Sequence, residues 1–288
     1  MAKQSCNRPM FANAFQSSLP AIPFYVRASA EVRGTFACAG RTTKLIDTFE
    51  TGGLRLRTPK AGEWCEAVVL NTAGGLAGGD EARMSFVAES NANVCITTQS
   101  AEKIYRAEDK PVVLAADVHV GDGANLVWMP QETILFDGSG LERSLMIEMA
   151  ENASVLAVES TVFGRVARGE RLSSGAFRDR WRIRRGAGLV FAEDVRLAGA
   201  ISEIAAKAAV GNGACAIATL AFLSPDAEEC LPIVRSVVET DSVDGGASAW
   251  NGMLIVRLAG RDPFDVRAVV TAVLRRLSRI PLPRVWSI

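Results

Sequence analysis

The chain has 288 residues, of which 49% are hydrophobic and 22% charged, and its 32 basic residues balance its 32 acidic ones. This composition is typical of a globular protein and argues against a disordered chain. Zero net charge argues against broad, non-specific binding to nucleic acid, which needs a basic excess.

The sequence predicts neither a membrane span nor a signal sequence. No apolar run reaches the roughly 18 residues that span a membrane, and no signal sequence follows Lys3 and Arg8. We expect residues 1–24 to form a loose tail and residues 25–288 a single domain. Six cysteines without a C-x-x-C pair are typical of buried free thiols in a reducing compartment. We therefore predict a cytoplasmic protein that has neither a membrane nor a nucleic acid as its partner.

Most of the chain predicts β-strands. Short segments rich in Val, Ile, Thr and Phe are broken by Gly, Asn and Asp about every ten residues. We predict strands at 67–71, 84–88, 93–98, 112–120, 125–129, 144–149, 154–158, 177–184 and 189–192.

A weak internal repeat runs through these strands. Ala92, Ala124, Ala153 and Ala187 each lie between a tight polar turn and a strand, at spacings of 32, 29 and 34 residues. A period near 30 predicts stacked β layers, and four unrelated hairpins in a sandwich are the alternative. The predicted fold is mainly β, with solenoid-like antiparallel and parallel layers. Polar residues that follow each alanine by six to eight positions would then form a column, in which acidic groups repel one another unless water, a base or a cation lies between them.

The C-terminal region predicts two α-helices. Residues 226–239 and 262–279 carry apolar side chains at three- and four-residue spacing. Asp262 is suited to cap the second helix, Pro263 to occupy its first position, and Pro281 to stop it. One more strand is predicted between the helices, at 252–258.

Residues 71–80 are the most unusual segment, because two pairs of glycines lie within it. Paired glycines permit positive φ and close backbone approach. A phosphate-binding loop would end in Gly-Lys-Ser/Thr and lead into a helix, whereas a strand follows here. We instead predict a crowded crossover between layers that presents Asp80 at a loop end. The glycines are Gly74, Gly75, Gly78 and Gly79.

Four arginines alternate along the predicted strand at 177–184. Such spacing places all four on one face of the strand, with Asp179, Trp181 and Ile183 on the other. An arginine stripe suits an acidic partner surface or phosphate groups, and a merely solvated strand face is the alternative. The stripe comprises Arg178, Arg180, Arg182 and Arg184.

Metal chemistry is constrained by the single histidine, His119. A catalytic triad or a multi-histidine metal site is excluded within this chain. Any divalent ion would be held mostly by carboxylates and carbonyls, hence weakly, unless a partner donates ligands. In the polar segment 97–106, Lys103 could pair with Asp80 or Glu159 or act as a base, and a surface loop is the alternative.

Five segments together resemble the UreD family of urease accessory proteins, also called UreH. They occur in the same order as in that family, and their number and order make the resemblance specific. The segments are 74–80, 97–106, 130–136, 163–165 with Glu170, and 178–181.

The resemblance implies a mainly β body and a role that is not enzymatic. Members of this family help to insert nickel into the urease apoenzyme, work in a complex with UreF and the GTPase UreG, and look as if they pass nickel through an internal channel. Several weak carboxylate sites admit and release an ion, so we expect transient nickel(II) and no tightly bound cofactor. The metal-path candidates are Asp80, Glu132, Glu159, Glu193 and Asp194, with Lys103 as a charge-balancing neighbour.

Two alternatives come from other functional classes. One is a β-solenoid enzyme that acts on carbohydrate through paired acids about 5–9 Å apart and exposed aromatic side chains, although aromatic residues make up only 7% of the chain. The other is a passive protein-interaction module without an ion path.

The balanced charge is unevenly distributed along the chain. Residues 165–185 carry eight basic and two acidic residues, and residues 261–288 carry six and two. We expect these basic stretches to be docking surfaces. In the second stretch we place Arg267 and Arg276 on the exposed face of the last helix, near the interface with UreF.

Overall fold

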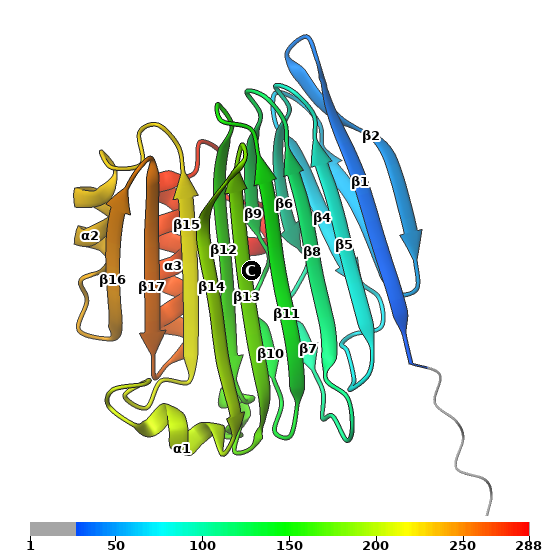
Figure 1. Cartoon of the computed structure of the whole chain (residues 1–288). Helices are drawn as coiled ribbons and strands as arrows, with labels where there is room; N and C mark the ends of the chain where they lie inside the picture. Colours follow the sequence, from blue (N-terminus) through cyan, green and yellow to red (C-terminus); the bar gives the residue numbers. More distant parts are fainter. Residues whose placement is uncertain (1–26, 288) are drawn as a thin grey trace, which may run out of the picture.

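The computed structural model describes residues 27–287, so the predicted tail at 1–24 lies outside the described residues. Two β-sheets pack face to face (Figure 1). The seven-stranded sheet has the order β14 (Gly188–Gly199), β13 (Gly175–Arg185), β11 (Gly140–Met149), β8 (Val112–Val120), β5 (Glu81–Ala88), β1 (Ser29–Ala39) and β2 (Thr42–Thr51). The second sheet has the order β16 (Val243–Trp250), β17 (Met253–Gly260), β15 (Ala216–Leu223), β12 (Ser154–Phe163), β9 (Asn125–Met129), β6 (Asn93–Thr98), β4 (Cys65–Asn71) and β3 (Leu54–Lys60). The short strand β10 (Thr133–Leu135) pairs with β12, and β7 (Glu102–Ile104) pairs with β10.

The chain alternates between the sheets from β4 to β13, apart from the short strands β7 and β10. As a result β5, β8, β11 and β13 run parallel in one sheet, and β4, β6, β9 and β12 run parallel in the other. This is the mainly β, solenoid-like architecture that the sequence predicts. The outer strands β2, β3, β14, β15, β16 and β17 pair antiparallel with their neighbours.

The thirty-residue repeat is confirmed for three of its four members. Asn93 pairs with Asn125, and Asn125 pairs with Ser154, so the preceding alanines are stacked and buried. The Asn125 side chain also donates to Asn93 Oδ1 at 2.8 Å. The fourth member is wrong: Ala187 lies in the hairpin that returns β14 antiparallel onto β13 within the same sheet. The hairpin ends the stack of layers.

Two hydrophobic cores hold the layers together. One lies between the sheets, and the other lies between the second sheet and the helices α2 (Leu231–Val238) and α3 (Pro263–Leu277) (Figure 1). Asp262 caps α3 as predicted, because its side chain accepts from the backbone N–H of Phe264 at 2.8 Å. A short helix, α1 (Ile201–Ala206), was not predicted. None of the helices in the described part of the chain is long and apolar enough to cross a bilayer.

Candidate functional site: a polar band between the sheets

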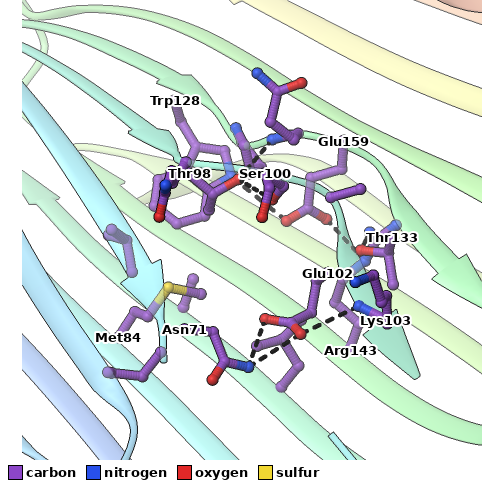
Figure 2. A pocket seen from close by; sticks show the side chains of 18 of the residues that line it. Asn71, Met84, Thr98, Ser100, Glu102, Lys103, Trp128, Thr133, Arg143 and Glu159 are labelled. Carbon is purple, nitrogen blue, oxygen red and sulfur yellow. Dashed lines mark hydrogen bonds and ion pairs between the residues drawn. The ribbon is translucent and has the colours of Figure 1, made fainter. Parts of the chain in front are cut away.

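A cavity of about 80 Å³ lies between the two sheets (Figure 2). Its lining includes exposed residues of two loops, among them Gly74, Gln99 and Ser100, and buried residues such as Trp128 and Glu159. The exposed loops therefore form its mouth and the buried residues its floor. This volume accommodates a few water molecules.

Two charged side chains of the cavity floor, Arg143 and Glu159, meet a third, Asp179, which lies outside the lining. Arg143 on β11, Glu159 on β12 and Asp179 on β13 are 4%, 5% and 8% exposed. Strand alternation aims Arg143 and Asp179 inward from one sheet and Glu159 inward from the other. The buried cluster holds two carboxylates and one guanidinium. Burial raises the pKa of Glu159 to about 7, although the nearby positive charge of Arg143 opposes this rise.

Arg143 directs its hydrogen bonds to Asp179 rather than to Glu159. Its Nε donates to Asp179 Oδ1 at 3.0 Å and its Nη2 to Oδ2 at 2.6 Å. Thr133 and Thr161 accept from the Nη atoms at 3.1 and 3.0 Å. Glu159 Oε2 lies 3.1 Å from Nε without a directed hydrogen bond, because the single hydrogen on Nε points to Asp179.

Glu102 lines the cavity on the side of the exposed loops. Both of its carboxylate oxygens accept from Asn71 Nδ2 at 3.0 Å, and Oε1 also accepts from the backbone N–H of Lys103 at 3.1 Å. Burial raises the pKa of Glu102, and these hydrogen bonds oppose the rise. Glu102 supplies a carboxylate between the mouth and Glu159.

Glu193 continues the polar layer beyond the cavity, toward the edge formed by β14. Its Oε1 accepts from Arg257 Nε of the opposite sheet at 2.8 Å, and its Oε2 from Thr219 Oγ1 at 3.4 Å. Thr219 is the strand neighbour of Glu159. The side chain of Arg257 is 57% exposed, so this end of the layer reaches solvent. We call the sequence of side chains from Glu102 through Glu159 to Glu193 the polar band.

The polar band contains only part of the predicted column. Glu159 and Glu193 lie in it, whereas Asp194, the neighbour of Glu193, points to the outer face. There Asp194 pairs with Arg178, whose hydrogen bonds hold the Asp194 pKa at about 2. The prediction that these acids line one column is therefore wrong for Asp194, because successive strand residues point to opposite faces.

Asp80 and Glu132 also lie outside the polar band, and within residues 27–287 Lys103 lacks its predicted partners. Asp80 accepts from the backbone N–H groups of Ala28 and Ala77, both at 2.8 Å, and so closes its own loop. Glu132 pairs with Arg267. Lys103 lines the cavity, but in the described structure it pairs with neither Asp80 nor Glu159. The cation beside Glu159 is Arg143 instead, whereas the charge of Lys103 acts on Glu102.

The glycine segment forms the predicted crowded crossover from β4 in one sheet to β5 in the other. A Cβ atom on Gly75 would lie 2.5 Å from the ring of Tyr105, and one on Gly78 would lie 2.6 Å from Ala107 Cα. Gly74 and Gly79 have positive φ. The close approach at Gly75 and Gly78 explains why these positions require glycine.

The arginine stripe lies on one face of β13, as predicted. Arg178 is tied to Asp194, and Arg182 donates to the carbonyl oxygens of Trp181 and Glu193. Arg184 is exposed, and Arg180 forms no ion pair within residues 27–287. Three of the four arginines therefore make contacts within the chain, since Arg184 also donates to the carbonyl oxygen of Ala187 at 3.3 Å.

The two arginines predicted on α3 differ in exposure. Arg276 is exposed, but the exposed placement of Arg267 is wrong, because its side chain is 21% exposed. Arg267 bonds to Gln131 and Glu132 and lies against the ring of Trp286. It ties the helix to the loop after β9.

Sequence reasoning missed Glu102, Arg143 and Asp179 as members of the site. For Arg143 a signal was present, because it alternates with Leu141 and Leu145, which predicts an inward position. Glu102 carries no comparable signal, since its position depends on how two loops meet.

Comparison with known proteins identifies the family. The model of the family described as UreD urease accessory protein matches residues 28–287. The proteins named Urease accessory protein UreD from Methylobacterium sp. (strain 4-46) and Beijerinckia indica subsp. indica are each 43% identical to this chain, over 275 and 262 residues. These matches cover 93% and 90% of this chain, and 98% and 97% of those proteins. The protein of that name from Rhizobium leguminosarum bv. trifolii is 43% identical over 264 residues, 90% of this chain and 96% of that protein. This is a family of accessory proteins rather than of enzymes, and the chain belongs to it: the UreD family of urease accessory proteins.

Proposed function

We propose that the chain helps to deliver nickel(II) to the urease apoenzyme, in a complex with UreF and the GTPase UreG, and that the ion moves along the polar band. The observation that carries this proposal is the band itself. Glu102, Glu159 and Glu193 are spaced along a layer that interrupts an otherwise apolar interior. Burying charge is costly, so a band of this kind points to a role beyond packing.

The chemistry of the band suits passage rather than storage. Within residues 27–287, no three His, Cys, Asp or Glu side chains converge in a group that could hold a metal ion. The three carboxylates of the band are spaced one after another, and Asp179, the second carboxylate beside Glu159, is engaged by two hydrogen bonds from Arg143. An ion that meets single carboxylates in succession is bound weakly enough to move on.

The same proposal places the protein in the cytoplasm and gives it two docking surfaces. Cys38, Cys65, Cys95, Cys215 and Cys230 are free thiols, which suits a reducing compartment. The exposed arginines of β13 and α3 provide positive charge for acidic partner surfaces.

Urease activation tests the proposal. Cells that lack this protein but express urease and the other accessory proteins would be complemented with the wild type, with Glu159→Gln and with Glu148→Gln. Glu148 is 60% exposed on β11, the strand that precedes β12 in the chain, and lies outside the cavity lining, which makes it a matched control. We expect Glu159→Gln to lose most urease activation at normal protein levels, and Glu148→Gln to retain it. Full activation by Glu159→Gln would contradict the ion path and favour a passive interaction module.

A further inference from the structure

We infer that Arg143, held in place by Asp179, keeps divalent-cation binding at Glu159 weak enough for the ion to leave. This inference rests on the proposed delivery of nickel through the polar band. It gives Arg143 a role of its own, which is to weaken the binding of the ion at Glu159.

The guanidinium of Arg143 is fixed from several directions. Asp179 accepts two hydrogen bonds from it, and the hydroxyl groups of Thr133 and Thr161 accept one each. A planar donor group with these four contacts cannot turn away without leaving buried acceptors unpaired. The positive charge of Arg143 is therefore a permanent part of the cavity floor.

Glu159 is the incompletely satisfied member of the cluster. It lines the cavity, and its Oε1 accepts only a long hydrogen bond of 3.4 Å from Trp128 Nε1. Its Oε2 is buried and has no hydrogen-bond donor, although Arg143 Nε lies 3.1 Å away. Glu159 thus has acceptor capacity for a cation that enters the cavity.

The fixed charge of Arg143 and the unsatisfied carboxylate of Glu159 together determine how tightly the site binds a divalent cation. A divalent cation bound to Glu159 would lie close to the fixed charge of Arg143, and the repulsion between like charges is strong in a water-poor interior. Without Arg143, Glu159 and Asp179 would present two buried carboxylates to the same ion. Such a pair would bind the ion tightly and block its passage.

Nickel binding to the purified full-length chain, measured by isothermal titration calorimetry with Ni²⁺ alone, tests this inference. The double variant Arg143→Met/Asp179→Asn removes the guanidinium without leaving the buried Asp179 carboxylate unpaired, and it leaves Glu159 as the remaining carboxylate of the cluster. We expect it to bind Ni²⁺ about tenfold more tightly than the wild type. The single variant Asp179→Asn should instead bind several-fold more weakly, because it frees Arg143 to bond to Glu159.

Two further variants locate the effect. Adding Glu159→Gln to the double variant should abolish the gain in affinity. Arg165→Met, which breaks the ion pair with Glu170 outside the cavity lining, should leave binding unchanged. Binding by the double variant that is no tighter than that of the wild type would overturn the inference. That result would leave the proposed function standing, because the function is judged by urease activation of Glu159→Gln, whereas this assay contains no urease.

Discussion

Arg267 on α3 donates to the carboxylate of Glu132, and its guanidinium carbon lies 4.9 Å from the centre of the Trp286 ring. The helix is thereby joined to the loop after β9, which borders the cavity. Arg267→Ala would leave Glu132 partly buried without its cation. We predict a loss of about 2 kcal/mol in the free energy of unfolding, measured by urea denaturation.

The control for this prediction is Arg276→Ala on the same helix. Arg276 is exposed, so its loss should change the free energy of unfolding by no more than about 0.5 kcal/mol. Equal losses of unfolding free energy in the two variants would show that the contacts of Arg267 stabilise the fold no more than an exposed arginine does.

Gly75 and Gly74 provide a matched pair for the crossover loop. Gly75 has φ of +154° and no room for a Cβ beside Tyr105, whereas Gly74 has φ of +76° and nothing within 4 Å of its Cβ position. We predict that Gly75→Ala costs about 3 kcal/mol of stability, through both strain and overlap. Gly74→Ala should cost only about 1 kcal/mol, from strain alone. Thermal unfolding would distinguish them, and a larger effect at Gly74 would refute the steric account.

The raised pKa of Glu159 predicts a specific pH dependence of stability. In the unfolded chain Glu159 loses its proton near 4.5, and in the folded chain near 7. Between these values the folded state holds one more proton, so the wild type loses stability as the pH rises. Glu159→Gln does not titrate at this position. The advantage of the variant in unfolding free energy should therefore grow from pH 4.5 to 7 and then level off, whereas parallel stability curves would show that the Glu159 pKa is not raised.

Docking through α3 predicts a charge effect on UreF binding. We expect Arg276→Glu to lower the affinity for UreF about fivefold, because it reverses an exposed charge at the proposed interface. Arg83→Glu, an equally drastic change on the exposed face of β5, is the control. Surface-immobilised UreF would report both affinities. Equal binding of Arg276→Glu and the wild type would place the interface elsewhere.

The stacked fold could be predicted because its signal is local. Three strands, at 93–98, 112–120 and 125–129, match their predicted bounds, and the alanine spacing gave the layer period. The strands β1, β2, β3, β7, β15 and β16 were missed, and in β1, β2, β3 and β16 polar and glycine residues interrupt the apolar alternation. The fourth repeat failed because a tight turn looks the same whether the chain next enters the other sheet or returns to the same one.

The site could be predicted only in part for a related reason. Alternation correctly placed Asp179 on the packed face of β13, and two acids of the predicted column, Glu159 and Glu193, lie between the sheets. Which partner each carboxylate finds depends on side chains from distant strands, as the contact of Glu193 with Arg257 illustrates. Spacing along the chain does not encode such pairings.

If nickel travels through the interior of this protein, substitutions of the adjacent acids Glu193 and Asp194 give the most direct test. The two acids are adjacent on β14, but Glu193 faces the polar band and Asp194 the outer surface. The measurement is the nickel content of urease after activation in vitro with the complete set of accessory proteins. An interior path predicts that Glu193→Gln lowers nickel incorporation several-fold while Asp194→Asn leaves it unchanged. Equal incorporation with both variants, at the level of the wild type, would contradict it.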